Sequence, residues 1–123
     1  MGVVEERRVI GKKAIESAVE AVRQLEDTLG PVSAAVIGSY ARRDFNQWSD
    51  IDLLVVSPNF NRNILERFEQ VKHVLKNYPD IEIIPLTPHE FERQRRLKTP
   101  SAQELAEKGA LITDSLNIFS KQF

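Results

Sequence analysis

The chain contains no cysteine, which excludes disulfide bridges, thiolate metal sites and a cysteine nucleophile. It has no apolar run that approaches the roughly 18 residues needed to span a membrane, and residues 1–8 lack the apolar core of a signal peptide. Basic and acidic residues nearly balance, leaving a formal net charge of -1 at pH 7. The surface as a whole therefore offers no general attraction for nucleic acid. We expect a cytoplasmic protein that holds any polyanionic ligand locally, through a few basic side chains or a metal ion.

What the chain does contain is typical of a folded globular protein. Hydrophobic residues make up 41% of the sequence and charged residues 28%, a balance that excludes a disordered chain. A length of 123 residues suits one hydrophobic core. Neither an internal repeat nor a linker divides the chain, so we expect a single domain over residues 1–123.

Two helices are predicted by apolar residues at steps of three and four. The first runs from about Glu5 to Leu29, where Gly30 and Pro31 end it. Its apolar stripe comprises Ile15, Ala18, Val19, Val22, Leu25 and Leu29. The second ends before Pro79, and its stripe comprises Ile64, Leu65, Phe68, Val71, Val74, Leu75 and Tyr78. We expect both stripes to face the core.

Strands and shorter helices are predicted in the rest of the chain. Short apolar runs predict strands at residues 32–37, 51–56, 81–86 and 110–113. Thr87 and Glu90 have the spacing of a capping box and open a charged helix that continues to about Leu97. Ser101 opens a further helix, which Gly109 ends.

The order of these elements favours an α/β fold with a small sheet in two or three layers. Residues 53–56 are apolar on both faces of their strand, which indicates a central strand covered on both sides by helices. Residues 39–48 are polar and turn-like, with room for one or two helical turns.

Asp50 and Asp52 flank Ile51 at the start of the second predicted strand. Residues two apart in a strand point to the same face, so the two carboxylates converge. Such a pair is unfavourable unless a cation or solvent offsets its charge, and carboxylate oxygens suit Mg²⁺. The alternative is a pair of solvated acids at the beginning of a strand.

Glu82 and the Gly38-Ser39 pair are further candidates. Glu82 lies within an apolar strand, where a charge is costly without a partner. It is either a metal-facing or catalytic acid or a plain carboxylate of an edge strand. Gly38 and Ser39 follow the first predicted strand, where a glycine lets the backbone approach a phosphate. Taken alone they are a weak signal, and the alternative is an ordinary turn between a strand and a helix.

These motifs together resemble a known signature. The segment Val36-Ile37-Gly38-Ser39-Tyr40-Ala41-Arg42-Arg43, followed after residue 49 by Asp50-Ile51-Asp52-Leu53-Leu54-Val55, is similar to the signature of the DNA polymerase β-like nucleotidyltransferase superfamily. The spacing and the short chain most resemble the minimal nucleotidyltransferases. The resemblance implies a nucleotidyltransferase-like α/β (α+β) fold with a small mixed β-sheet flanked by helices.

The resemblance also implies roles for individual residues. Gly38 and Ser39 would hold the triphosphate of ATP or another nucleoside triphosphate. Asp50 and Asp52 would bind two Mg²⁺ ions, and Glu82 would help to bind one of them and activate the attacking hydroxyl group. The metal ligands are therefore predicted to be Asp50, Asp52 and Glu82.

Arg42 is predicted to contact a phosphate group, because a guanidinium matches phosphate oxygens in a bidentate manner. A solvated turn arginine is the alternative. The chain departs from the family pattern in two places. Arg43-Asp44 stands where a glycine is usual, and the third acid is Glu82 where an aspartate is more frequent.

The function implied is Mg²⁺-dependent transfer of a nucleoside monophosphate, AMP from ATP, to a hydroxyl group. Relatives of this kind are often encoded beside a HEPN-domain partner as the antitoxin of a toxin–antitoxin pair, where the acceptor would be a tyrosine of the toxin. Because the short chain has no large substrate domain, the acceptor would come from that partner or from a second copy in a homo-oligomer. The alternative is a binding module with a weakened site that neutralises its toxin by contact.

The remaining polar features have ordinary explanations beside functional ones. A basic cluster near residue 95 comprises Arg93, Arg95, Arg96 and Lys98. It predicts a solvated helix face, with a surface for RNA or for an acidic partner as the alternative. His73 and His89 are expected on helix surfaces. Trp48 either stacks on a base or packs over the turn before the acids.

Overall fold

The computed structural model describes residues 3–42, 45 and 49–119, with side chains from residue 11 onward. Within these ranges the elements follow the predicted order. They are α1 (Val3–Leu29), β1 (Ser33–Ile37), α2 (Ser39–Arg42), β2 (Ile51–Val56), α3 (Ile64–Leu75), β3 (Ile81–Leu86), α4 (Pro88–Leu97), α5 (Pro100–Lys108) and β4 (Ala110–Asp114). In the described part of the chain, no helix combines the length and apolar character needed to cross a bilayer.

The four strands form one mixed sheet in the order β3-β2-β1-β4. Strand β1 is antiparallel to both β2 and β4, whereas β2 and β3 are parallel and are joined by the crossover helix α3. The predicted small mixed sheet flanked by helices is therefore confirmed. Strand β2 is internal, and every residue in it except Asp52 is buried, as the apolar run predicted.

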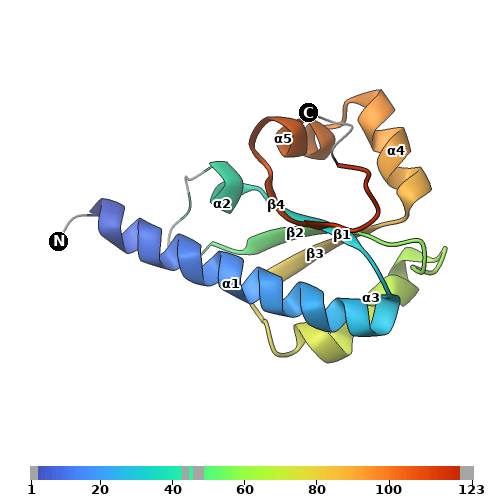
Figure 1. Ribbon diagram of the computed structural model, residues 1–123, viewed down its shortest axis with the longest axis horizontal. Coiled ribbons are helices and arrows are strands. Elements are labelled where there is room, and N and C mark those ends of the chain that lie inside the picture. The colour runs from blue at the N-terminus through green and yellow to red at the C-terminus, as the bar shows by residue number, and fades with distance from the viewer. Residues whose placement is uncertain (1–2, 43–44, 46–48, 120–123) are drawn as a thin grey trace.

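Helices cover both faces of the sheet, with α1 and α3 on one side and α4 and α5 on the other (Figure 1). The first face packs on the apolar stripe of α1, whose residues Ala18, Val22, Leu25 and Leu29 are buried. The second face packs on Phe91 of α4, Leu105 of α5 and Phe119 near the end of the described chain. The fold thus has three layers and two apolar cores, separated by the sheet.

The predicted apolar stripe of α3 is correct only in its second half. Val71 and Val74 are buried, but Ile64, Leu65 and Phe68 are exposed by 57%, 76% and 43%. The inner face of the helix instead begins with a charged residue, because Arg67 precedes Val71 and Val74 by one and two helical turns. The first turn of α3 therefore turns its large apolar side chains towards solvent.

The caps of the last two helices explain their bounds. The capping box of α4 is present as predicted: the Glu90 backbone N–H donates to Thr87 Oγ1 at 3.3 Å, and the Thr87 N–H donates to Glu90 Oε1 at 2.9 Å. Helix α5 begins at Pro100, with Thr99 as its N-cap, where the sequence predicted a start at Ser101. A proline is favourable at the first helical position, so the cap lies before it. Gly109 caps the other end, as predicted.

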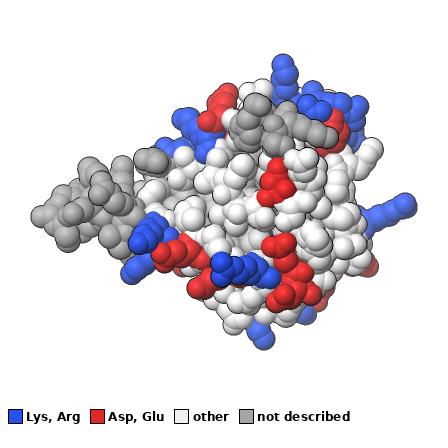
Figure 2. All heavy atoms as spheres, viewed as in Figure 1, with Lys and Arg blue, Asp and Glu red and all other residues white. Residues whose placement is uncertain are grey.

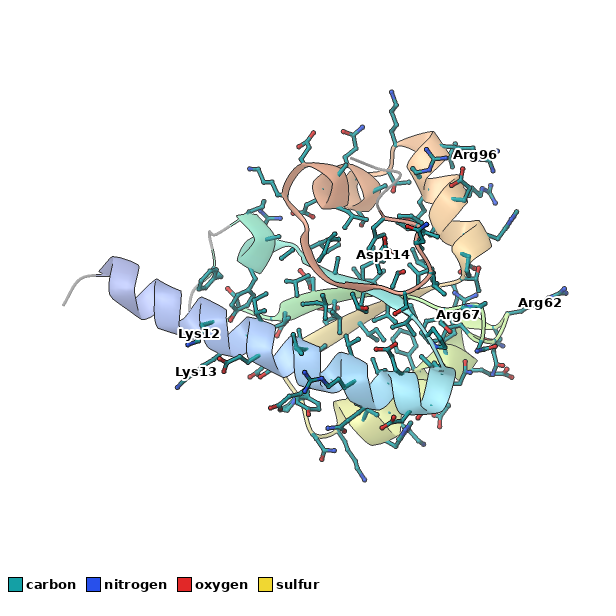
Figure 3. All side chains as sticks on the ribbon, viewed as in Figure 1. Lys12, Lys13, Arg62, Arg67, Arg96 and Asp114 are labelled. Carbon is teal, nitrogen blue, oxygen red and sulfur yellow. The ribbon has the colours of Figure 1, made fainter. Side chains whose placement is uncertain are left out.

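Arg67 is a buried cation that ties three segments together. Its side chain is enclosed at the junction of α3, the end of β3 and the start of α4 (Figure 3), and the residue is only 1% exposed. The guanidinium donates to both carboxylate oxygens of Glu90 at 2.6 and 2.9 Å. It also donates to the backbone carbonyls of Asn61 at 2.6 Å and Pro85 at 3.0 Å. A buried charge without these partners would be strongly unfavourable.

We predict that in Glu90→Gln the free energy of unfolding changes less between pH 7 and pH 3 than in the wild type. The hydrogen bond from Arg67 is the main cause that lowers the pKa of Glu90 from 4.5 to about 2. A carboxyl group with a lowered pKa stabilises the fold above its unfolded value of 4.5, and this contribution is lost as the pH falls towards 2. Loss of the charge-assisted hydrogen bonds should lower the free energy of unfolding at pH 7 by roughly 1–3 kcal/mol, less to the extent that solvent reaches the carboxylate.

Urea denaturation between pH 7 and pH 3 provides the measurement. Glu69→Gln is the matched control, because Glu69 pairs with Lys72 on the surface of α3, where both side chains are about 70% exposed. This control should change the free energy of unfolding by less than about 0.5 kcal/mol. Equal losses for the two variants at pH 7 would contradict the structural role of the Arg67–Glu90 pair.

Candidate functional site

The backbone just after β1 lies very close to the side chain of Asp52 near the start of β2. Gly38 follows β1 directly and has a φ of +76°, a conformation that favours glycine. A Cβ atom on Gly38 would lie 2.1 Å from Asp52 Oδ2 and 3.0 Å from its Cγ. The chain therefore needs a glycine here for two reasons, the backbone conformation and the space taken by the Asp52 carboxylate.

The parallel register of β2 and β3 brings two predicted acids side by side. Asp52 is the partner of Glu82 in that ladder, and on its other side it is opposite Ile37 of β1. Paired residues of neighbouring strands share one face of the sheet. Glu82 is exposed, and its strand β3 lies at an edge of the sheet. Asp50 immediately precedes β2 and is exposed.

Negative charge accumulates around Asp52. The pKa of its carboxyl group is raised first by partial burial and then by the charges of Glu82, Asp50 and Glu104, whereas Arg42 acts in the opposite direction. Asp50 and Glu82 thus both act on Asp52, although Glu82 comes from the neighbouring strand. A group with a raised pKa in such a cluster favours a bound cation, which would offset the repulsion.

The donor set fits Mg²⁺ rather than a fully enclosed metal. In the described part of the chain, no group of three or more His, Cys, Asp or Glu side chains is gathered as a complete metal site. Mg²⁺ commonly takes only one or two protein carboxylates and fills its other positions with water and substrate phosphate oxygens. Asp52 and Glu82 in register, with Asp50 beside them, supply hard oxygen donors of this kind. The assignment of Asp50, Asp52 and Glu82 as metal ligands stays a prediction.

Helix α2 places the other predicted residues beside the acids. It begins at Ser39, directly after Gly38, and the Arg42 backbone N–H donates to the Gly38 carbonyl at 3.0 Å. The Arg42 side chain forms an ion pair with Glu104 of α5. The structure therefore brings Gly38, Ser39 and Arg42 to the same end of the sheet as Asp52, but it shows the Arg42 guanidinium on a carboxylate of a distant segment.

Two residues near the acids were missed by sequence analysis. Glu104 reaches the site from α5, and no local pattern marks it, because only the packing of α5 against β1 brings it there. Tyr40 stacks on Phe45 with ring centroids 4.4 Å apart. Burial raises the pKa of the Tyr40 hydroxyl, and the charges of Asp80 and Asp50 add to the shift. Asp80 follows Pro79 in a turn and offered no sequence signal for a site.

The remaining candidates lie away from these acids or outside the described residues. His73 and His89 are exposed, as predicted, and His73 Nε2 lies 2.8 Å from Thr28 Oγ1. The basic cluster lies on and just after α4, where Lys and Arg side chains gather on the surface (Figure 2), and Arg96 points outward from that helix (Figure 3). Arg95 pairs with Glu92 on the same helix. Arg43, Asp44 and Trp48 lie outside the described residues.

Comparison with known proteins relates this arrangement to one family. Residues 15–109 match the family model described as "Nucleotidyltransferase domain". A provisionally assigned nucleotidyltransferase from Sulfolobus solfataricus has a similar structure, with a TM-score of 0.67 and 19% sequence identity over 90% of this chain and 89% of that one. Among proteins of curated function, none matches the sequence significantly.

Two further similar structures are toxin–antitoxin complexes. One is a toxin–antitoxin with AMP-PNP, with a TM-score of 0.59 and 14% identity over 85% of this chain and 79% of that one. The other is a tri-AMPylated Shewanella oneidensis HEPN toxin in complex with an MNT antitoxin, with a TM-score of 0.54 and 12% identity over 88% and 79% of the two chains. At these identities the likeness concerns the fold alone. The match to the family model confirms the nucleotidyltransferase resemblance inferred from the sequence signature.

We predict that Gly38→Ala destabilises the protein more than Gly30→Ala. Both glycines have a positive φ, +76° and +75°, and an alanine in that conformation costs roughly 1–2 kcal/mol. At Gly30 a Cβ atom would meet nothing closer than 3.7 Å, whereas at Gly38 it would collide with Asp52. Overpacking of this kind should lower the free energy of unfolding by about 1–3 kcal/mol more, measurable by urea denaturation.

The contact with Asp52 can be isolated by a double variant. In an Asp52→Ala background the carboxylate is absent and only the Cβ atom of residue 52 remains nearby, at 3.3 Å, so most of the extra cost of Gly38→Ala over Gly30→Ala should disappear. If the two glycine variants lose the same free energy in the wild-type background, the close approach of Gly38 to Asp52 is wrong.

Proposed function

Because this chain belongs to the nucleotidyltransferase domain family, we propose that it transfers a nucleoside monophosphate, AMP from ATP, to a hydroxyl group. The observation that carries this proposal is the contact between the Gly38 backbone and Asp52, with Glu82 in register on the next strand. A backbone that can approach a phosphate thus lies directly beside paired carboxylates. This combination suits a metal-bound triphosphate better than either feature alone.

Different residues of the site would bind the phosphate groups and the metal ions. Gly38 and Ser39 would hold the triphosphate at the start of α2, and Arg42 would contact a phosphate group. Asp50, Asp52 and Glu82 would hold two Mg²⁺ ions. When bound, Mg²⁺ would offset the negative charge of the carboxylates and phosphates and stabilise the charge that develops at the α-phosphate.

The transfer step forms one bond and breaks another. The oxygen of the acceptor hydroxyl forms a bond to the α-phosphorus of ATP, and the bond from that phosphorus to the bridging oxygen breaks. The electron pair of the broken bond leaves with pyrophosphate. Glu82 would take the proton of the acceptor hydroxyl, because it is exposed at the edge of the sheet where an acceptor can approach.

A HEPN-domain toxin would supply the acceptor, with a tyrosine hydroxyl as the modified group. Two observations on other proteins support this. A toxin–antitoxin complex of similar fold holds AMP-PNP, and a HEPN toxin in complex with an MNT antitoxin of similar fold carries AMP groups. We place the reaction in the cytoplasm, where ATP and Mg²⁺ are available.

We predict that the protein binds ATP only in the presence of Mg²⁺, and that Asp50→Asn/Asp52→Asn removes this binding. The double variant removes the carboxylates that would hold the metal, so isothermal calorimetry should show no heat of binding. Glu66→Gln/Glu69→Gln is the matched control, because it removes two carboxylates from exposed positions on α3. Wild-type binding that survives in the site variant would place the nucleotide elsewhere.

A protein that neutralises its toxin by contact alone is the second candidate. The ion pair between Arg42 and Glu104 favours it, because that pair holds the predicted phosphate-binding side chain on a carboxylate.

We predict that the HEPN partner gains the mass of AMP groups when it is incubated with the wild type, ATP and Mg²⁺. The Asp50→Asn/Asp52→Asn variant should abolish both this modification and the neutralisation of the toxin. Neutralisation by the double variant would support contact alone.

A further inference from the structure

Arg42 and Glu104 form an ion pair between segments that are far apart in the chain. Arg42 closes the single turn of α2, and Glu104 lies in the middle of α5. The pair joins Arg42 Nη1 to Glu104 Oε1, and the two side chains are 42% and 22% exposed. Because α5 packs against β1 and α2 follows β1 directly, the pair spans the end of the sheet that carries the acids.

The Gly38 turn closely approaches the Asp52 carboxylate, the central acid of the site. Arg42 is also held near the Gly38 turn by the backbone hydrogen bond from its N–H to the Gly38 carbonyl, at 3.0 Å. The side chain that could bind a phosphate is thus kept on a negative group beside the place where that phosphate would lie.

We propose that Glu104 is a positioning residue that competes with the nucleotide for Arg42, so that a triphosphate must displace Glu104 to bind. This inference rests on the proposed function, since it concerns the same site. It goes beyond that function by assigning Glu104 a role in setting the affinity of the site for nucleotide. Glu104 then disfavours weakly charged ligands, and a triphosphate overcomes the competition with its several negative charges.

The exchange is physically reasonable because the two interactions differ in strength. Partly exposed ion pairs between single charges contribute little to stability. A guanidinium binds phosphate oxygens through parallel hydrogen bonds and carries its charge at all relevant pH values. A triphosphate at the Gly38 turn should therefore displace the Glu104 carboxylate from Arg42. The cost of breaking the ion pair still lowers the affinity of the protein for the triphosphate.

The main test is the effect of Glu104→Gln on ATP binding in the presence of Mg²⁺. Glutamine keeps the size of the side chain and removes its charge, so the variant should bind ATP about two- to fivefold more tightly, the range expected for a partly exposed ion pair. Glu107→Gln is the matched control, because Glu107 is an exposed glutamate on the same helix. It should leave the dissociation constant unchanged. If the wild type binds ATP and Glu104→Gln binds it equally or more weakly, the inference about Glu104 is wrong but the proposed function is not affected.

A double-mutant cycle separates competition for Arg42 from simple repulsion of the nucleotide by Glu104. Arg42→Ala should weaken ATP binding, and Glu104→Gln should then add no gain in that background. An equal gain from Glu104→Gln with and without Arg42 means repulsion only and overturns the competition. Thermal unfolding of each variant checks that the fold is retained.

A second measurement does not depend on nucleotide binding by the wild type. The side-chain Nε–H resonance of Arg42 should shift in Glu104→Gln and stay in place in Glu107→Gln, and no shift in either variant overturns the inference. If the wild type fails to bind ATP but Glu104→Gln binds it, the competition is supported and is strong. If neither binds ATP or inorganic tripolyphosphate, the proposed function and this inference both fail.

Discussion

In-register pairing of β2 with β3 places Asp52 beside Glu82, and the rest of the site is arranged around these two carboxylates. The register is fixed by burial, because a slip of one residue would turn the apolar residues of β2 from one core to the other and bring Asp52 into the core beneath α1. At the far end of β3, the Arg67 guanidinium binds the Pro85 carbonyl and Glu90 and so fixes this strand to α3 and α4. One strand pairing and one buried cation thus hold the two ends of β3.

Among the described residues, the site combines an excess of negative charge with the Arg42 guanidinium, which is already paired with Glu104. Asp50, Glu82 and Glu104 all raise the pKa of Asp52, and Arg42 offsets only part of their effect. Under the proposed function, such an arrangement would repel a bare triphosphate and would accept one that arrives with divalent cations. Selectivity for metal-bound nucleotide would then follow from the balance of charges, in addition to the shape of the Gly38 turn.

Sequence reasoning succeeded where local patterns determine the outcome. Apolar periodicity predicted the two long helices, short apolar runs predicted the four strands, and capping signals predicted the last two helices, all in the observed order. Sequence reasoning failed where packing between distant segments determines which side chains are buried or reach the site. Ile64 belongs to an apolar stripe by spacing, yet the inner face of α3 begins at Arg67, whose partners lie in other elements. Glu104 likewise reaches the site only because α5 packs on β1.

The parallel pairing of β2 and β3 also has a consequence for the order of folding. The antiparallel strands β1 and β2 are separated by residues 38–50, whereas the parallel strand β3 follows β2 only after residues 57–80, which include α3, so the parallel pair closes the longer loop. During synthesis, Gly38 and Asp52 emerge long before Glu82. The nascent chain can therefore bring the Gly38 turn to Asp52 while the third carboxylate is still absent. Competence for catalysis would then be acquired in one late step, when the edge strand docks.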